Sequence, residues 1–270
     1  MPGGLALHAN GDDTTPLWIA DAWTLREFNR ETGNCSNIHR CVLGVNGFTA
    51  PMTVNGDGTE LIVSSWLGCV QVINPTTCEL VECYDYREIG AKPVNSIRYH
   101  GEVVVAEHVS GSVFRAHDQS LLASGFTAPT GLAASNGDLW VADRGTGTVW
   151  WIAHDGIPLT EKIAVATGLA APEGLVALND RTLLVAETDA GRLTRIDLRS
   201  GSTMVLAESL DFGLEAAAGM PPSWGFTDIS IDAVNNLAYV SSDVANLVYV
   251  IDLPAGRHHG DMMDEGAIIP

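Results

Sequence analysis

Short apolar runs separated by turns rich in Gly, Asn, Asp and Pro make up most of the chain. Residues 137–144 read Gly-Asp-Leu-Trp-Val-Ala-Asp-Arg, an apolar run between polar ends that predicts a buried β-strand. The run Val-Trp-Trp-Ile at 149–152 follows a Gly-containing corner and predicts the next strand. No long helix-forming stretch interrupts this pattern, so the sequence predicts an all-β fold.

The same pattern of runs and turns recurs along the chain. Residues 128–134 (Ala-Pro-Thr-Gly-Leu-Ala-Ala) and 171–177 (Ala-Pro-Glu-Gly-Leu-Val-Ala) are near copies, and a similar apolar strand follows each. Four weaker copies share the motif of two or three apolar residues, a small residue and a polar one. The small residues lie 36 to 55 residues apart, at Ala20, Ser64, Ala106, Ala142, Ala186 and Ser241.

Repeats of this length are typical of propeller blades, each of which buries its faces only against its neighbours. The sequence therefore predicts one domain, residues 1–270, that folds as a six-bladed β-propeller with four-stranded antiparallel blades. A two-sheet sandwich is the alternative, but it would not need the same corner six times. The last strand, around 267–269, is expected to close the sixth blade. Residues 208–224 form an insertion that either caps the central funnel with Phe212 and Trp224 or is a divergent outer strand.

The charge balance narrows the choice of partners. The chain has 14 Lys and Arg against 33 Asp and Glu, a net charge of −19, so nucleic acid and anionic membranes are excluded as principal partners. A small-molecule substrate is therefore the expected binding partner. No run of 18 apolar residues and no signal peptide is recognised, and the compartment and the oligomeric state stay open.

Five cysteines lie in the first third of the chain and lack the spacing of a zinc site. Cys35 with Cys41, or Cys78 with Cys83, are candidate disulfides in an oxidising compartment, and free thiols are the alternative.

Propeller geometry predicts which residues line the funnel. The first residues of each innermost strand and the polar residues that end each second strand should emerge at one face. Met52, Trp23 and Trp66 are expected to form an apolar wall there, opposite a polar arc. The polar arc is expected to contain Asn95, Glu107, His108, Asp143, Arg144, Glu173, Glu187, Asp228 and Asp243.

The pairing of Ala-Pro-x-Gly-Leu with Leu-Trp-Val-Ala-Asp resembles the superfamily of SMP-30/gluconolactonase-like, strictosidine-synthase-like and NHL-repeat propellers. The last blade, residues 237–252, is also similar to YVTN-type repeats. The resemblance covers essentially the whole chain, but its motifs specify the repeat more than an activity.

The resemblance to gluconolactonase-like enzymes implies a hydrolase of a lactone or small ester. It implies a divalent metal (Ca²⁺, Mg²⁺ or Mn²⁺) that polarises the carbonyl and is held by Asn95, Glu173 and Asp228. The chain departs from that family in having Gly3 where the first metal-binding Glu is expected, and Thr130 where an Asn is expected.

The remaining functional residues are assigned by chemical type. The catalytic candidates are Glu173, His108 and Glu187, and the substrate-binding candidates are Trp66, Arg144, Thr130 and Asp143. Corner carboxylates such as Glu107, Asp143 and Glu187 also have a structural reading, because they commonly accept backbone N–H groups. Two other functions stay open: a metal-free lyase or strictosidine-synthase-like enzyme that uses Glu173 or Glu187, and a non-catalytic NHL/YVTN-type binding propeller.

Overall fold

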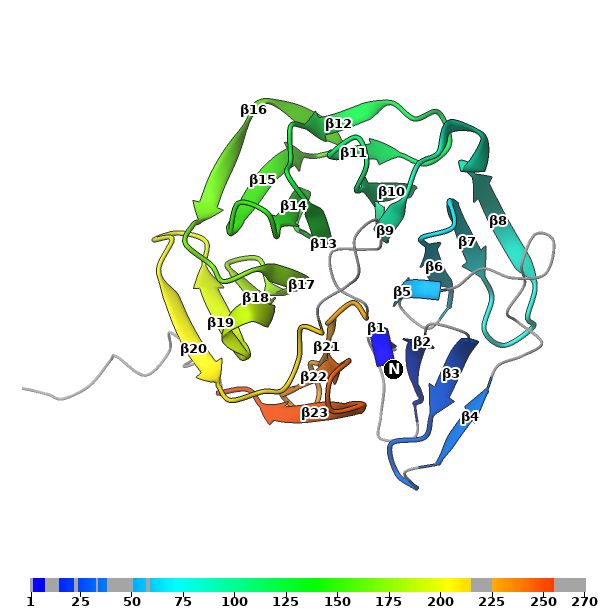
Figure 1. Ribbon diagram of the computed structural model, residues 1–270, viewed down its shortest axis with the longest axis vertical. Helices are drawn as coiled ribbons and strands as arrows, with labels where there is room; N and C mark the ends of the chain where they lie inside the picture. Colours follow the sequence, from blue (N-terminus) through cyan, green and yellow to red (C-terminus); the bar gives the residue numbers. More distant parts are fainter. Residues whose placement is uncertain are drawn as a thin grey trace, which may run out of the picture.

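The protein forms a ring of six antiparallel sheets around a central axis (Figure 1). The computed structural model describes residues 2–7, 15–21, 24–32, 34–37, 51–56, 59–214 and 225–254. Five sheets have four strands, and the sixth has three within these residues. The fold is a six-bladed β-propeller, which confirms the predicted fold class.

The chain enters each blade at its innermost strand and proceeds outward. Blade 1 contains β1 (Pro2–Leu7), β2 (Leu17–Asp21), β3 (Thr24–Phe28) and β4 (Cys35–Asn37). Blade 2 contains β5 (Pro51–Gly56), β6 (Leu61–Ser65), β7 (Cys69–Ile73) and β8 (Leu80–Asp85). Blade 3 contains β9 (Pro93–Tyr99), β10 (Glu102–Glu107), β11 (Ser112–Arg115) and β12 (Leu121–Ser124).

The second half of the ring repeats this order. Blade 4 contains β13 (Pro129–Ser135), β14 (Asp138–Asp143), β15 (Thr148–His154) and β16 (Ile157–Ala166). Blade 5 contains β17 (Pro172–Asn179), β18 (Thr182–Glu187), β19 (Arg192–Asp197) and β20 (Thr203–Ala207). Blade 6 contains β21 (Ile229–Asp232), β22 (Leu237–Ser242) and β23 (Leu247–Asp252). Two single 3₁₀ turns, Arg87–Ile89 and Thr188–Ala190, lie in corners.

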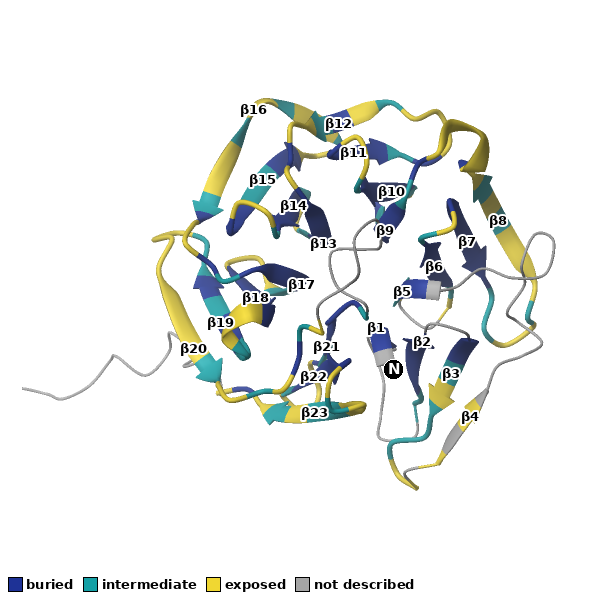
Figure 2. Ribbon diagram, viewed as in Figure 1, coloured by how far each residue is buried: buried dark blue, intermediate teal, exposed yellow. Residues whose placement is uncertain are grey.

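Burial falls from the axis to the rim, as Figure 2 shows. Strands β6 and β18 are buried at every position, because both of their faces pack against neighbouring blades. The second strands are therefore continuous apolar runs rather than alternating ones. The outer strand β16 is mostly exposed.

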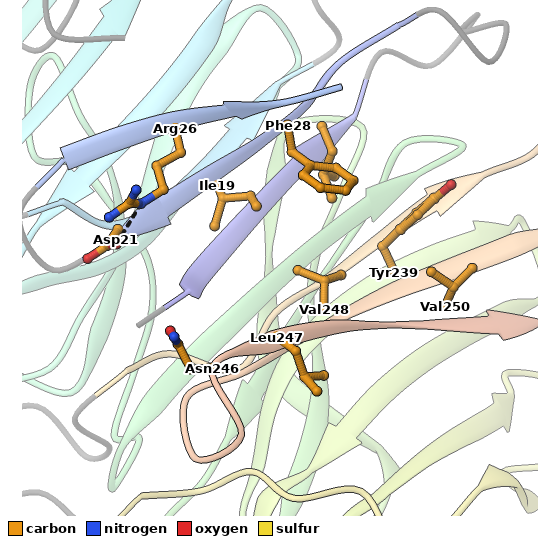
Figure 3. A pocket seen from close by; sticks show the side chains of 10 residues that line it. Ile19, Asp21, Arg26, Phe28, Tyr239, Asn246, Leu247, Val248 and Val250 are labelled. Carbon is orange, nitrogen blue, oxygen red and sulfur yellow. Dashed lines mark hydrogen bonds and ion pairs between the residues drawn. The ribbon is translucent and has the colours of Figure 1, made fainter. Parts of the chain in front are cut away.

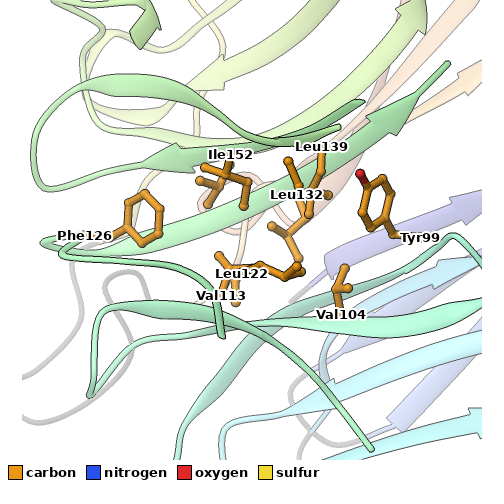
Figure 4. Close-up of a cluster of buried hydrophobic side chains, with 11 residues drawn as sticks. Tyr99, Val104, Val113, Leu122, Phe126, Leu132, Leu139 and Ile152 are labelled. Atoms are coloured by element: carbon orange, nitrogen blue, oxygen red, sulfur yellow. The ribbon is translucent and has the colours of Figure 1, made fainter. Parts of the chain in front are cut away.

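Apolar side chains fill the interfaces between blades. Between blades 3 and 4, Val104 and Leu122 meet Leu139 and Ile152 in one buried cluster (Figure 4). Phe126, which follows β12, completes this cluster, and its backbone N–H donates to the Gly111 carbonyl at 3.1 Å. Gly111 has φ 60°, and a Cβ there would lie 2.2 Å from the Phe126 carbonyl oxygen, so the corner requires glycine.

A bulge near the start of the innermost strand recurs in blades 1 to 5. In blade 4, Pro129 pairs with Asp143, but Leu132 pairs with Val141, so three steps on β13 match two on β14. Strands β1, β5, β9 and β17 shift register at the same place. A bulge bends the strand and increases its twist.

The interface between blades 6 and 1 closes the ring through side chains. Arg30, after β3, forms a buried ion pair with Asp232 of blade 6 and donates to the Tyr239 hydroxyl at 3.2 Å. The closing strand expected around 267–269 lies outside the described residues, as does Trp224. Phe212 packs in the core between blades 5 and 6, which places it away from the funnel.

Two further predictions can be compared with the structure. Cys78 is disulfide-bonded, whereas Cys69 and Cys83 are free thiols, so the predicted Cys78–Cys83 bond is wrong. Cys41 lies outside the described residues. Within the described part of the chain, no helix has the length and apolar character needed to cross a bilayer.

Candidate functional site

The first residues of the innermost strands and the last residues of the second strands lie together, as predicted. Pro93 pairs with Glu107, and Pro172 pairs with Glu187. We call this end of the ring the upper mouth.

Apolar side chains form one side of the upper mouth. Met52, Val94 and Phe226, from blades 2, 3 and 6, form one buried cluster, and the indole of Trp66 packs against it. The ammonium of Lys92 lies 5.9 Å from the centre of the Trp66 ring. Met52 and Trp66 are therefore part of an apolar wall, whereas Trp23 lies outside the described residues.

His108 lies at the edge of this apolar wall. It directly follows Glu107, the last residue of β10, and its backbone N–H donates to the Lys92 carbonyl at 3.1 Å. Its ring centre is 5.4 Å from that of Trp66. The Nδ1 atom is buried and has no hydrogen-bond partner within the described residues. Burial lowers the pKa of the imidazole below its usual 6.5, and the nearby charge of Glu107 opposes this shift only in part.

Glu173 and Arg144 form an ion pair between blades 5 and 4. Arg144 Nε donates to Glu173 Oε1 at 3.0 Å, and Arg144 Nη2 donates to Asp189 Oδ1 at 3.3 Å. Glu173 Oε2 accepts the Thr227 backbone N–H of blade 6 at 3.0 Å. The Glu173 side chain is fully buried, whereas 22% of the Arg144 side chain is exposed.

Asp228 connects blade 6 to blade 1. Its carboxylate accepts the N–H of Leu5 at 3.1 Å and that of Ile229 at 2.9 Å. Complete burial raises the pKa of Asp228 from 3.8 to about 7; the two N–H donors oppose this rise, and the charge of Glu173 adds to it. Asp228 is thus primarily a buried link between two blades.

Asn95 and Thr130 also link innermost strands. Asn95 Oδ1 accepts Asn55 Nδ2 at 2.7 Å, and the Thr130 hydroxyl lies 3.0 Å from the Pro172 carbonyl oxygen. The pairing of Pro93 shows that Val94, and not Asn95, is the counterpart of Thr130. Asn95 instead occupies the position that is glycine in β13.

The carboxylates at the ends of the second strands accept hydrogen bonds from the segments that lead into the innermost strands. Asp143 accepts the N–H groups of Thr127, at 3.2 Å, and Ala128, at 2.8 Å. Glu187 accepts the N–H of Ala170 at 2.7 Å. Glu107 and Asp243 act in the same way on Lys92 and on Gly213.

These contacts determine the charge of two corner carboxylates. Burial by itself would raise the pKa of Glu107 and of Glu187. Hydrogen bonds from Ser110 to Glu107, and from Arg192 and Thr194 to Glu187, outweigh that effect and lower both pKa values. The contacts are those of structural carboxylates, and the catalytic role of Glu187 stays a prediction.

The predicted metal ligands do not form a set of free oxygen donors. Asn95 Oδ1, both oxygens of Glu173 and both oxygens of Asp228 already accept hydrogen bonds from protein groups. The Arg144 guanidinium also lies where a cation beside Glu173 would be repelled. The arrangement of these three residues therefore does not fit a divalent metal. No group of three His, Cys, Asp or Glu side chains suited to a metal occurs within the described residues.

A groove of about 470 Å³ lies between the facing sides of blades 1 and 6. Figure 3 shows Ile19 and Phe28 on one side of it and Tyr239 and Val248 on the other. Its charged side chains, Asp21 and Arg26, are paired with each other at 2.7 Å. This groove is a mostly apolar gap between blades, and its one carboxylate, that of Asp21, is engaged with Arg26.

Sequence reasoning missed several residues of the upper mouth. Val94 was missed because Asn95, rather than the residue directly after Pro93, was aligned with Thr130. Lys92 precedes the Pro93 that begins β9, and Asp189 lies in a 3₁₀ turn after β18. The sequence signal for Lys92 was its rarity, because the chain contains only one other lysine, Lys162.

Comparisons with known proteins agree with this architecture. The NHL repeat model matches residues 126–152, which run from the residue Phe126 into β15 of blade 4. No curated protein sequence matches the chain. Among solved structures, the calcium-binding protein regucalcin from Agrobacterium tumefaciens has a TM-score of 0.68 and 13% identity, over 94% of this chain and 90% of that one.

Two enzymes have the same fold. A gluconolactonase from Xanthomonas campestris has a TM-score of 0.65 and 14% identity, over 94% of this chain and 86% of that one. Virginiamycin B lyase from Staphylococcus aureus has a TM-score of 0.57 and 15% identity, over 93% of this chain and 84% of that one. At these identities the likeness shows the fold alone. The chain is thus a six-bladed β-propeller with an NHL repeat, similar in structure to SMP-30/gluconolactonase-like proteins.

Proposed function

We propose that the protein is an enzyme that opens a lactone or small ester at the upper mouth, with His108 as the general base. The observation that carries this proposal is the state of His108. Its pKa is lowered, so the imidazole is neutral at pH 7, and its buried Nδ1 has no partner within the described residues. A neutral imidazole with an unpaired ring nitrogen is suited to accept a proton.

The surroundings of His108 support a small organic substrate. Trp66 is the partly exposed side chain that packs on the buried cluster of Met52 and Phe226, and the Arg144 guanidinium supplies polar donors. Ligand sites commonly combine a mostly apolar surface with a few polar groups that fix orientation.

The reaction requires only water as co-substrate. The imidazole of His108 takes a proton from water as the oxygen adds to the carbonyl carbon. The tetrahedral intermediate then expels the ring oxygen, which receives a proton from the imidazolium. A lactone and water thus give a hydroxycarboxylic acid, and His108 returns to its neutral form.

A metal-assisted hydrolase is the second candidate, favoured by the structural likeness to regucalcin and gluconolactonase. Asn95, Glu173 and Asp228 would supply its oxygen ligands. We favour the metal-free reaction because these oxygens are engaged with protein donors. The two candidates differ in whether a chelator abolishes turnover.

The test is hydrolysis of a panel of small lactones and esters by the wild type and by His108→Gln. Removing a general base should reduce kcat/KM by roughly 10²–10⁴. In the wild type, activity should rise with pH with its midpoint below pH 6.5, because the base must be deprotonated and its pKa is lowered. His117→Gln, an exposed histidine in blade 3, is the matched control and should leave turnover unchanged.

If His108→Gln hydrolysed the lactones and esters as fast as the wild type, His108 would not be the general base. Absence of turnover by the wild type on every lactone and ester would favour the non-catalytic propeller instead.

A further inference from the structure

A positively charged side chain occupies the part of the upper mouth where the resemblance implies a metal. Arg144 follows β14, and its backbone N–H donates to the Ala128 carbonyl at 2.9 Å. This bond fixes the backbone of Arg144, and the ion pair with Glu173 fixes its guanidinium. The cation is therefore part of the folded ring and not a mobile surface group.

The Glu173 carboxylate fixes the position of the Arg144 guanidinium. Its carboxylate is fully buried, with one oxygen on Arg144 Nε and the other on the Thr227 N–H. A buried carboxylate requires a partner charge and hydrogen bonds, and here both come from the neighbouring blades. Glu173 is in this way a positioning residue.

Arg144 retains donors for a ligand. A guanidinium has five N–H groups, and the contacts with Glu173 and Asp189 use two of them. Within the described residues no acceptor pairs with the others, and the side chain is partly exposed. The donors left over are those of Nη1 and one of Nη2, next to each other in the guanidinium plane.

We propose that the Arg144 guanidinium, positioned by Glu173, replaces a divalent metal as the cation of the upper mouth and binds the carboxylate or carbonyl oxygens of the ligand. This inference rests on the proposed function. The planar donors of Arg match a carboxylate in two parallel hydrogen bonds. As water adds to a lactone carbonyl, the carbonyl oxygen gains charge that the same N–H groups stabilise. The hydroxycarboxylate product carries the group that Arg144 should bind best.

The charges around the upper mouth determine how strongly Arg144 should bind an anion. Lys92 is a second cation there, beside Trp66. Glu173 and Asp189 partly neutralise Arg144, and the whole chain carries a net charge of −19. Both effects disfavour a strong anion site, so we expect carboxylates to bind weakly, with Kd on the order of 1 mM, and less well at high salt.

The test is binding of gluconate and of acetate, measured by ligand-observed NMR, with the uncharged polyol sorbitol as the matched ligand control. The wild type should bind both carboxylates and not sorbitol. Arg144→Gln should weaken gluconate binding at least tenfold. Arg144→Lys should bind gluconate with an affinity between those of the wild type and Arg144→Gln, because lysine keeps the charge but lacks the planar donors. His108→Gln should still bind gluconate, so this test is independent of the proposed base.

Because Arg144→Gln leaves Glu173 buried without its partner, this variant alone can unfold. The double variant Arg144→Gln/Glu173→Gln removes both charges and should fold, yet it should not bind gluconate. Arg87→Gln, which removes an exposed guanidinium paired with Asp85, should bind gluconate as the wild type does.

Metal analysis provides a second readout. Chelation should remove no stoichiometric ion and leave the melting temperature unchanged, as should added Ca²⁺ or Mn²⁺. About one divalent ion per chain, lost to the chelator with a fall in melting temperature, would overturn the inference. Gluconate binding by the double variant at wild-type affinity, or no carboxylate binding by the wild type, would also overturn it.

Discussion

Asp228 illustrates how a single buried side chain acquires its properties from the ring. Nothing around it in sequence, Phe-Thr-Asp-Ile, indicates a raised pKa. The shift to about 7 arises because blades 5, 6 and 1 together exclude water from the carboxyl and place Glu173 nearby. A carboxyl in this state favours its protonated form in the folded protein.

The pKa of Asp228 predicts a pH-dependent stability. Since the folded pKa of about 7 exceeds the usual 3.8, the stabilisation is fully present below about pH 3.8 and is lost as the pH rises through 7. The free energy of unfolding of the wild type, relative to Asp228→Asn, should therefore fall between pH 5 and pH 8. Chemical denaturation at both pH values measures this difference, and a difference that does not change with pH would contradict the prediction.

His108 and Arg144 were identified by sequence reasoning as polar residues at strand ends, and the structure explains how they differ. Arg144 is paired across blades with Glu173, whereas His108 Nδ1 is unpaired within the described residues. Their positions follow from the repeat. Their partners do not, because they come from other blades.

At the scale of elements, the innermost strand shows where the repeat predicted the structure correctly and where one residue was misaligned. The repeat predicted that the strand after Ala-Pro lies at the mouth, and β13 and β17 confirm it. Asn95 was misaligned by one residue, because Pro93 pairs with Glu107 as Pro129 pairs with Asp143, which makes Val94 the counterpart of Thr130. The alignment of Lys92-Pro93-Val94 with Ala128-Pro129-Thr130 carries the same information in the sequence.

The glycine in the bulge of β13 predicts a sharp cost of substitution. A Cβ on Gly131 would lie 2.2 Å from the Glu173 carbonyl oxygen of the next blade. Gly131→Ala should therefore lower the free energy of unfolding by about 3 kcal/mol, as measured by urea denaturation. Ser135→Ala at the end of the same strand is the control and should change it by less than about 0.5 kcal/mol. Equal stability of Gly131→Ala and the wild type would show that the innermost strands are less closely packed.

At the scale of the whole molecule, side chains hold the two ends of the described chain together. Arg30 and Asp232 have exposed side-chain fractions of 6% and 1%, so their ion pair lies within the interface of blades 6 and 1. Arg30 also donates through Nε to the Thr15 carbonyl oxygen at 2.9 Å. The ring therefore closes through a buried charge pair as well as through the Asp228 contact with Leu5.

Breaking this pair should weaken the ring. Arg30→Ala leaves Asp232 buried without its partner charge, which should cost about 3–5 kcal/mol of unfolding free energy. Arg87→Ala, which breaks the exposed pair with Asp85, should leave the free energy of unfolding almost unchanged. Thermal and urea unfolding of both variants measure the contrast, and equal effects would contradict a special role for the interface of blades 6 and 1.

The sequence by itself determined the number of repeats, the β-strand character and the end of the ring at which polar residues such as Asp143, Arg144 and Glu173 emerge. These properties are local, because each blade contains its own strands, turns and corner glycine. The tertiary structure decided that Arg144 pairs with Glu173, that the pKa of Asp228 rises to about 7, and that the Asn95, Glu173 and Asp228 oxygens are engaged. These properties belong to contacts between blades, which depend on radial packing and on the bulge, and no single repeat encodes them.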